Sequence, residues 1–447
     1  MPIFNGTSGP DNIGGSETAD TINGLGGDDL LGGFGGNDTI RGGDGDDTVI
    51  GGDGNDSIFG ENHDDLLLGE TGADLVDGGA GADILADNDI FVSGGVATAV
   101  PDGSRDDLRG GAGDDMLTGG LFDVFDGGTG SDLALINLSS TSGVTVDFRP
   151  MNTGGAGALP SGGSIRNVEA GINVTFGSGA NTAWGSNFFE EFFGGSGADT
   201  FDGGGGGDDL RGFGGNDAIQ GGDGVDAIQG GDGDDVMRGG AGADSLNGGA
   251  GVDTADYSAS AAGVTVDLAT GAAAGGDAAG DILTQIENVT GSALADILAG
   301  TTAANAFNGG GGDDAINGGG GVDTAVFASI ASDAAVWHRN VDGSWTITGT
   351  DGADTLANVE FLDFSDRGVF LDRASRTFSG NGTSDVLFRR TDGIIASWEV
   401  SGTTIGSAHF LPTAGAEWSI LATGDISGDG RDDVIWRRDN GLVYPGP

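Results

Sequence analysis

The chain has neither cysteine nor lysine, and only 3 of its 447 residues are histidine. Without cysteine it can form no disulfide, thiolate metal site or thiol nucleophile. Without lysine it can form no Schiff base. The histidines, His63, His338 and His409, stand far apart in unrelated sequence contexts. The usual sources of catalytic side chains are therefore scarce.

Motifs of common hydrolases are missing as well. The sequence has no His-Glu-x-x-His helix, which a zinc protease needs, and no Gly-x-Ser-x-Gly elbow, which a lipase needs. Paired aspartates occur throughout the chain, so their proximity does not indicate a glycosidase. We therefore predict that the chain is not an enzyme.

Long apolar runs are absent, since no 18-residue stretch is continuously hydrophobic. The first residues, Met1 to Thr7, show neither a basic region nor an apolar core of the kind that marks a signal peptide. We expect no transmembrane segment and no conventional cleaved signal.

Positive charge is scarce, because 16 arginines face 70 acidic residues and give a formal net charge of −54. Glycine supplies 97 residues, which raises the backbone entropy that folding must overcome. Both features oppose folding unless cations neutralise the carboxylates. The acidic balance also argues against nucleic acid as a partner and favours hard divalent cations.

What the chain does contain is a nine-residue repeat. Each unit has an aspartate, a glycine five residues before it and an aliphatic residue two after it, as in Gly42, Asp47 and Val49. The first run holds Asp11, Asp20, Asp29, Asp38, Asp47, Asp56, Asp65, Asp74 and Asp83. A second run holds Asp199, Asp208, Asp217, Asp226, Asp235, Asp244 and Asp253. Shorter runs hold Asp106 and Asp115, then Asp123 and Asp132 after a one-residue slip, and later Asp296, Asn305, Asp314 and Asp323.

Each unit reads as a glycine-rich turn followed by a short strand. Side chains alternate along a strand, so Asp47 and Val49 should face inward and Thr48 and Ile50 outward. Nine residues are too few for one circuit of a two-sheet solenoid. We therefore expect two units per circuit, with equivalent turns stacked 18 residues apart.

A cation between stacked turns would receive a carboxylate from each turn and carbonyl oxygens from the glycines. Ca²⁺ takes about six to eight oxygen ligands, whereas Mg²⁺ keeps several waters and fits less well. Thr18 and His63 replace the glycine at the fourth place of their units, which predicts weaker sites there. The alternative, a disordered acidic linker, gives no reason for the fixed phase between aspartate and aliphatic residue.

The repeat resembles the hemolysin-type, or repeats-in-toxin (RTX), nonapeptide Gly-Gly-x-Gly-x-Asp-x-U-x. This resemblance implies parallel β-rolls that bind several calcium ions, and an extracellular protein exported by a type I system through an uncleaved C-terminal signal. Calcium is thus the predicted cofactor. Cell-surface glycans or extracellular matrix polymers are candidate partners, and the oligomeric state stays open.

The last segment resembles FG-GAP-like repeats, the blade units of certain extracellular propellers. Its loop places Asp425, Ser427, Asp429 and Asp433 at alternating positions, which indicates a second kind of calcium loop. Only about two such units are present, whereas a propeller needs several blades to close. We expect an incomplete propeller here.

The predicted fold is all-β: parallel β-roll solenoids of calcium-binding nonapeptide repeats, interrupted by β-rich spacer modules, with a partial propeller-like segment at the C-terminus. The predicted boundaries are a roll at 1–88, an irregular roll at 89–135, a spacer at 136–189, a roll at 190–256, a spacer at 257–290, a short roll at 291–326, a β capping module at 327–372 and FG-GAP-like repeats at 373–447.

The predicted function is that of a secreted calcium-binding repeat protein whose rolls fold on Ca²⁺ outside the cell, in a structural, surface or adhesion role. The alternative is an accessory or truncated member of a secreted RTX toxin or hydrolase family whose catalytic module is lost or diverged. Catalytic turnover in an activity assay would favour the alternative.

Overall fold

The computed structural model describes residues 1–87 and 103–371 in full, and elsewhere only the backbone of the strands at 90–93, 96–99, 384–389, 395–401, 404–410, 418–424, 433–438 and 443–445. Apart from three short 3₁₀ helices, its regular elements are all β-strands, which confirms the predicted class. No helix in the described part has the length and hydropathy to cross a membrane. The chain forms two compact units, Met1–Asp253 and Thr254–Pro447.

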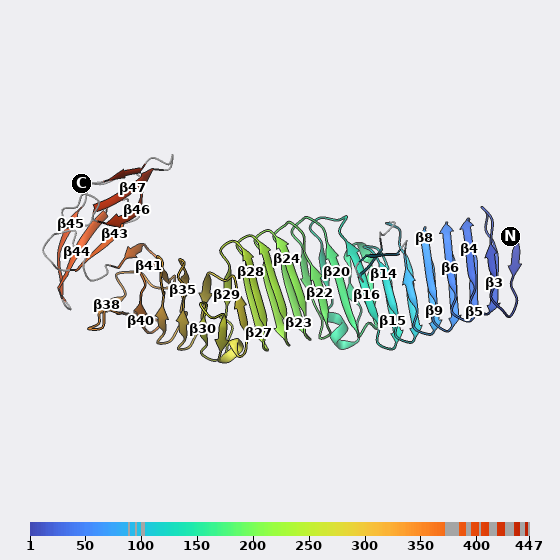
Figure 1. The fold of residues 1–447 in the computed structure, drawn as a ribbon, viewed down its shortest axis with the longest axis horizontal. Helices are drawn as coiled ribbons and strands as arrows, with labels where there is room; N and C mark the ends of the chain where they lie inside the picture. Colours follow the sequence, from blue (N-terminus) through green and yellow to red (C-terminus); the bar gives the residue numbers. More distant parts are fainter. Residues whose placement is uncertain are drawn as a thin grey trace. The chain divides into compact units, whose positions relative to one another are not determined.

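Strands of the first unit alternate along the chain between two sheets that are mainly parallel (Figure 1). One sheet contains β1 (Ile3–Asn5), β3 (Thr21–Gly26), β5 (Thr39–Asp44), β7 (Ser57–Asn62), β9 (Leu75–Ala80), β13 (Asp107–Ala112), β15 (Val124–Thr129), β17 (Thr145–Asp147), β18 (Gly157–Ala158), β19 (Ser164–Arg166), β21 (Thr182–Trp184), β23 (Thr200–Gly205), β25 (Ala218–Asp223) and β27 (Val236–Ala241).

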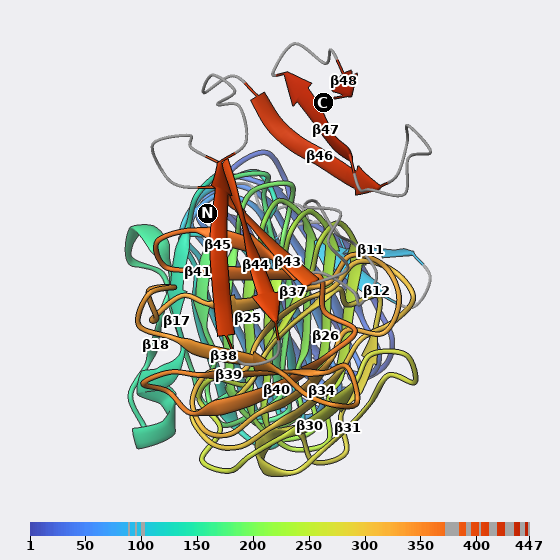
Figure 2. The same cartoon turned by 90° about the vertical axis from the view of Figure 1, so that its left-hand side faces the viewer.

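The other sheet contains β2 (Asn12–Gly14), β4 (Leu30–Gly35), β6 (Thr48–Asp53), β8 (Leu66–Thr71), β10 (Ile84–Ala86), β14 (Met116–Gly119), β16 (Leu133–Leu138), β20 (Gly171–Phe176), β22 (Glu190–Phe193), β24 (Asp209–Gly214), β26 (Ala227–Asp232) and β28 (Ser245–Ala250). Figure 2, which looks along the stack, shows the successive strands β25 and β26 in different sheets.

Stacked coils lie 18 residues apart, as predicted. Thr21 of β3 pairs with Thr39 of β5, and Leu30 of β4 pairs with Thr48 of β6. The aliphatic residue of each unit, such as Val49, is fully buried between the two sheets. The strands are longer than the three residues we predicted, because the glycines that begin the next unit continue the pairing, as in β6.

The strand pairing continues through the irregular parts of the first unit. After the hairpin of β11 (Ile90–Ser93) and β12 (Val96–Ala99), Asp107 of β13 pairs with Leu75 of β9. Within the predicted spacer at 136–189, Gly171 of β20 pairs with Leu133 of β16. The 3₁₀ helices η1 (Arg149–Thr153) and η2 (Pro160–Gly162) lie in the connection around β18, at the side of the sheets (Figure 2). The spacer thus consists of enlarged coils of the same solenoid.

The second unit repeats this arrangement. Its first sheet holds β29 (Thr254–Asp256), β33 (Asn288–Thr290), β35 (Ala306–Asn308), β37 (Thr324–Phe327), β41 (Phe361–Phe364), β42 (Gly368–Phe370), β43 (Ser384–Arg389), β44 (Ile395–Ser401) and β45 (Thr404–Phe410). Its other sheet holds β30 (Thr265–Asp267), β31 (Ala272–Ala274), β32 (Ile282–Thr284), β34 (Ile297–Ala299), β36 (Ala315–Asn317), β38 (Val336–Arg339), β39 (Trp345–Thr348) and β40 (Ala353–Ala357); β46 (Trp418–Gly424), β47 (Asp433–Arg438) and β48 (Val443–Pro445) form a third sheet, and η3 spans Gly276–Ala278.

The predicted capping module at 327–372 is antiparallel where it departs from the coils. β38, β39 and β40 form a meander, and β40 pairs in parallel with β36. Phe364 stacks on Phe327 with ring centres 5.2 Å apart and lies 5.7 Å from Trp337. The aromatic residues of this segment therefore pack together, as a hydrophobic cap requires.

Candidate metal sites of the repeat turns

The repeat aspartates lie on the inner side of the turns. All of those between Asp20 and Asp323 expose 0–3% of their surface, and Asp11 at the first turn is half-buried. Inward direction follows from strand alternation, because the aspartate stands two residues before the buried aliphatic residue. Burying so many carboxylates without compensation would oppose folding strongly.

One oxygen of each carboxylate has a fixed partner. The backbone N–H of an aspartate donates to Oδ1 of the aspartate one coil later, at 2.8 Å from Asp29 to Asp47 and again from Asp47 to Asp65. The same bond joins Asp208 to Asp226 and Asp296 to Asp314. We call each such series an aspartate ladder. The ladder explains the 18-residue spacing of the acidic residues, since only then do donor and acceptor meet.

The other oxygen is buried and has no hydrogen-bond partner in a large set of turns. Within the described residues this holds for Oδ2 of Asp29, Asp38, Asp47, Asp56, Asp65, Asp83, Asp106, Asp115, Asp132, Asp208, Asp217, Asp226 and Asp235. Next to it lies the glycine that begins the unit. A Cβ on Gly42 would stand 2.2 Å from Asp47 Oδ2 and 2.9 Å from the carbonyl oxygen of Gly60. Glycine therefore leaves room beside the unsatisfied oxygen.

Burial keeps these carboxyl groups from ionising easily. It raises the pKa of Asp65 to about 7, with added repulsion from the carboxylates of Asp83 and Asp47, against the lowering effect of the hydrogen bond from the Asp47 amide. For the same leading reason, burial, the pKa is raised to about 6 for Asp47, Asp56, Asp83, Asp115, Asp226 and Asp354, and to about 7 for Asp208, Asp217 and Asp314. A cation would stabilise the ionised form.

Asn181 shows what the turn accepts in place of a cation. It stands where other units have aspartate, and its amide nitrogen donates to the carbonyl oxygens of Gly177 and Gly179 at 3.1 and 2.7 Å and to Asp199 Oδ1 at 2.9 Å. Two turn carbonyls and the carboxylate of the next coil thus converge on one positively polarised group. An all-oxygen donor set of this kind fits Ca²⁺.

A second kind of turn satisfies its own carboxylate. In it, serine or threonine holds the second place of the unit, and its amide donates to the acidic residue four positions on. Ser16 donates to Asp20 Oδ2 from its amide at 2.6 Å and from its hydroxyl at 2.8 Å. The same arrangement occurs with Thr7 and Asp11, Ser292 and Asp296, and Thr301 and Asn305.

These hydroxyl-capped turns stand at the start of the runs, where Ser186 likewise donates its hydroxyl to Glu190. In the following turns, the second place has positive φ, for example 82° at Leu25 and 124° at Gly43, so its amide does not reach the carboxylate. We did not predict this distinction, although serine or threonine at the second place is visible in the sequence.

Two further ladder members were missed. The Asp314 amide donates to Asp354 Oδ1 at 3.0 Å, and the Asp323 amide donates to Glu360 Oε2 at 2.9 Å. Asp354 is two residues before the buried Leu356, which repeats the phase of the nonapeptide units. The long separation from Asp314 concealed it.

Other predicted positions lie outside these ladders. Asp425, Ser427 and Asp429 fall outside the described residues, and Asp433 begins β47, of which only the backbone is described. His63 has a φ of 80° and its Nδ1 accepts the Gly45 amide at 3.2 Å, which fits a turn residue.

Comparison with known families agrees with this geometry. The family model described as RTX calcium-binding nonapeptide repeat (4 copies) matches residues 5–33, 32–67, 59–86, 177–210, 184–219, 193–228, 220–255 and 290–325. A comparison with curated proteins gave no match. The matched segments contain both kinds of turn, and their buried aspartates are those of the ladders. Residues 5–86, 177–255 and 290–325 therefore belong to the RTX calcium-binding nonapeptide repeat family.

Proposed function

We propose that this calcium-binding repeat protein is secreted, that its coils fold on binding several Ca²⁺ ions outside the cell, and that the folded chain acts as a structural or surface protein. The observation that carries the proposal is the row of buried Oδ2 atoms without partners beside turn carbonyls. A Ca²⁺ ion at each such turn supplies the missing positive charge.

The turns with an unsatisfied Oδ2, such as those of Asp47 and Asp217, are the proposed calcium sites. A site of this kind does not exist in the unfolded chain, so its binding free energy contributes to folding. Extracellular calcium modules bind with dissociation constants of about 10⁻⁴–10⁻³ M. The protein would therefore remain unfolded where calcium is scarce and fold on export. Type I secretion and contact with glycans or matrix polymers are further parts of the proposal.

A calcium titration of the purified chain tests this function. We expect a steep, cooperative gain of β signal in far-UV circular dichroism together with a smaller hydrodynamic radius, and no such change with Mg²⁺. A chain that is already compact in chelator, or that stays expanded at millimolar Ca²⁺, contradicts calcium-dependent folding. Assays against glycans, lipids and peptides in saturating Ca²⁺ test the non-catalytic role, which robust turnover would overturn.

A single ladder aspartate should affect the titration measurably. Asp47→Asn keeps an oxygen acceptor for the Asp29 amide but removes the charge, so it should raise the calcium midpoint roughly two- to tenfold, or about 0.4–1.4 kcal/mol. The matched control is Asp53→Asn, which removes the same charge from an exposed side chain at the end of the same strand. Equal midpoints for the two variants contradict a special role of the ladder.

A further inference from the structure

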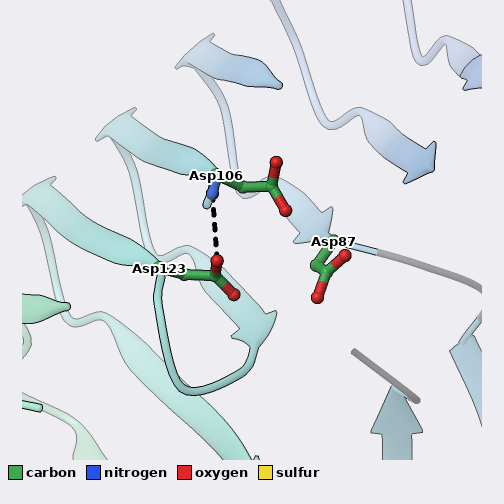
Figure 3. A group of neighbouring side chains, drawn as sticks. All are labelled: Asp87, Asp106 and Asp123. Atoms are coloured by element: carbon green, nitrogen blue, oxygen red, sulfur yellow. Dashed lines mark hydrogen bonds between the residues drawn. The ribbon is translucent and has the colours of Figure 1, made fainter. Parts of the chain in front are cut away.

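Three buried carboxylates meet where the nonapeptide register is broken. Asp87, Asp106 and Asp123 each expose 1% of their surface, and one oxygen from each lies within 4.8 Å of the others. Figure 3 shows the three side chains, with the Asp87 and Asp106 carboxylates turned toward each other. Asp106 and Asp123 are ladder aspartates, whereas Asp87 belongs to no aspartate position of the repeat.

Asp87 stands where the other units have their first glycine. It follows Asp83 by four residues, as Gly42 follows Asp38. At Gly42 the absent side chain leaves room beside the unsatisfied aspartate oxygen. At Asp87 a third carboxylate takes this place, and its backbone amide is held by the carbonyl of Thr118 at 3.0 Å. This departure concentrates negative charge in the interior.

The break in register brings the other two acids there. Asp106 lies 32 residues after Asp74, whose amide donates to its Oδ1 at 2.6 Å, because the hairpin of β11 and β12 enlarges this coil. Asp123 lies only 17 residues after Asp106 and accepts the Asp106 amide at 3.0 Å (Figure 3). Its Oδ2 accepts the amide of Gly120 at 2.6 Å. Asp106 Oδ2, almost completely buried, has no hydrogen-bond partner in the described structure.

We propose that Asp87, Asp106 and Asp123 form a separate calcium site that fills at lower free Ca²⁺ than the repeat turns. Three carboxylates offer more charge than the two of a repeat turn, and ligand charge is one of the properties that set calcium affinity. The ligands are buried, which disfavours Mg²⁺, since that ion keeps several waters. The site does not depend on calcium binding at the repeat turns.

Equilibrium dialysis of the full chain against a series of Ca²⁺ concentrations, with Mg²⁺ present throughout, tests this site. The wild type should bind one equivalent at about tenfold lower free Ca²⁺ than the rest. Asp87→Asn should lose that equivalent and keep the others. The control Asp77→Asn, which removes a half-buried carboxylate from β9 outside the cluster, should retain it. An isotherm of Asp87→Asn equal to that of the wild type overturns the proposal, and so does a wild type without a tight equivalent, in which a shared proton relieves the repulsion.

A second measurement covers the case in which Asp87→Asn fails to fold. In a crystal structure of the wild type grown in Ca²⁺, an anomalous calcium peak should lie about 2.3–2.6 Å from an oxygen of each of the three side chains. A water molecule, or direct contact among the carboxyl groups at that place, would falsify the assignment. This readout is also independent of the calcium midpoint for folding of the coils.

Discussion

In calcium-free buffer the chain should be expanded at pH 8 and compact, with β structure, at pH 5. Protons can replace calcium because both neutralise the buried ladder carboxylates. Burial raises the pKa of Asp217 to about 7 and that of Asp226 to about 6, from a model value of 3.8 that also describes the unfolded chain. The folded chain therefore binds these protons more tightly. Its stability rises as the pH falls from about 7 to about 4, and is lost as the pH rises again.

Far-UV circular dichroism and hydrodynamic radius between pH 8 and pH 5 measure this effect. The series should stop above the isoelectric point, about 4.1, because a chain without net charge tends to associate. A sample at pH 8 with high NaCl separates neutralisation from screening, since salt acts mainly on exposed charges. If that sample folds as fully as the one at pH 5, general charge repulsion and not the buried ladder controls folding.

Gly54→Ala should lower the free energy of unfolding in saturating Ca²⁺ by about 4 kcal/mol or more. Gly54 has a φ of 137°, and a Cβ there would lie 1.9 Å from the carbonyl oxygen of Gly36 in the preceding coil. The clash is with backbone, so no side chain can move aside. It also separates the turn carbonyls that we propose as calcium ligands. Both the calcium midpoint and the thermal midpoint should shift.

The matched control is Gly32→Ala in β4. A Cβ on Gly32 meets no atom within 4 Å, and its φ is not positive. Alanine there should change stability by less than about 1 kcal/mol, with a small gain from the less flexible unfolded chain. Similar losses in the two variants would mean that glycine at the fourth place serves no stacking function. Hydrogen exchange around Gly36 should report the local effect, since coils contact only their neighbours.

The repeating part of the fold could be predicted from the sequence because its chemistry has a single period. Asp47 and Val49 share a phase, and that phase fixes the inward face, the two-unit coil and the 18-residue stacking. The enlarged coils could not be predicted in this way. Pairing between Leu133 and Gly171 spans 38 residues, and no periodic signal connects strands so far apart.

The candidate site was predictable to the level of the ladder residues, but not to the level of which oxygen is satisfied. Whether Asp20 has a partner for Oδ2 depends on φ at the residue four before it, and Ser16 provides the hydroxyl. Asp87 was missed because its sequence context resembles no unit, and only the fold brings it to Asp106. Asp354 was missed because the β38–β39 meander separates it from Asp314.

The aspartate ladder has a direction in time. Each aspartate amide finds its acceptor on the following coil, as Asp29 does on Asp47 and Asp47 on Asp65. During synthesis from the N-terminus, the newest coil is therefore always incomplete, and its amide waits for residues that the ribosome has not yet added. Premature ordering inside the producing cell is disfavoured by the order of synthesis itself, independently of the calcium concentration there.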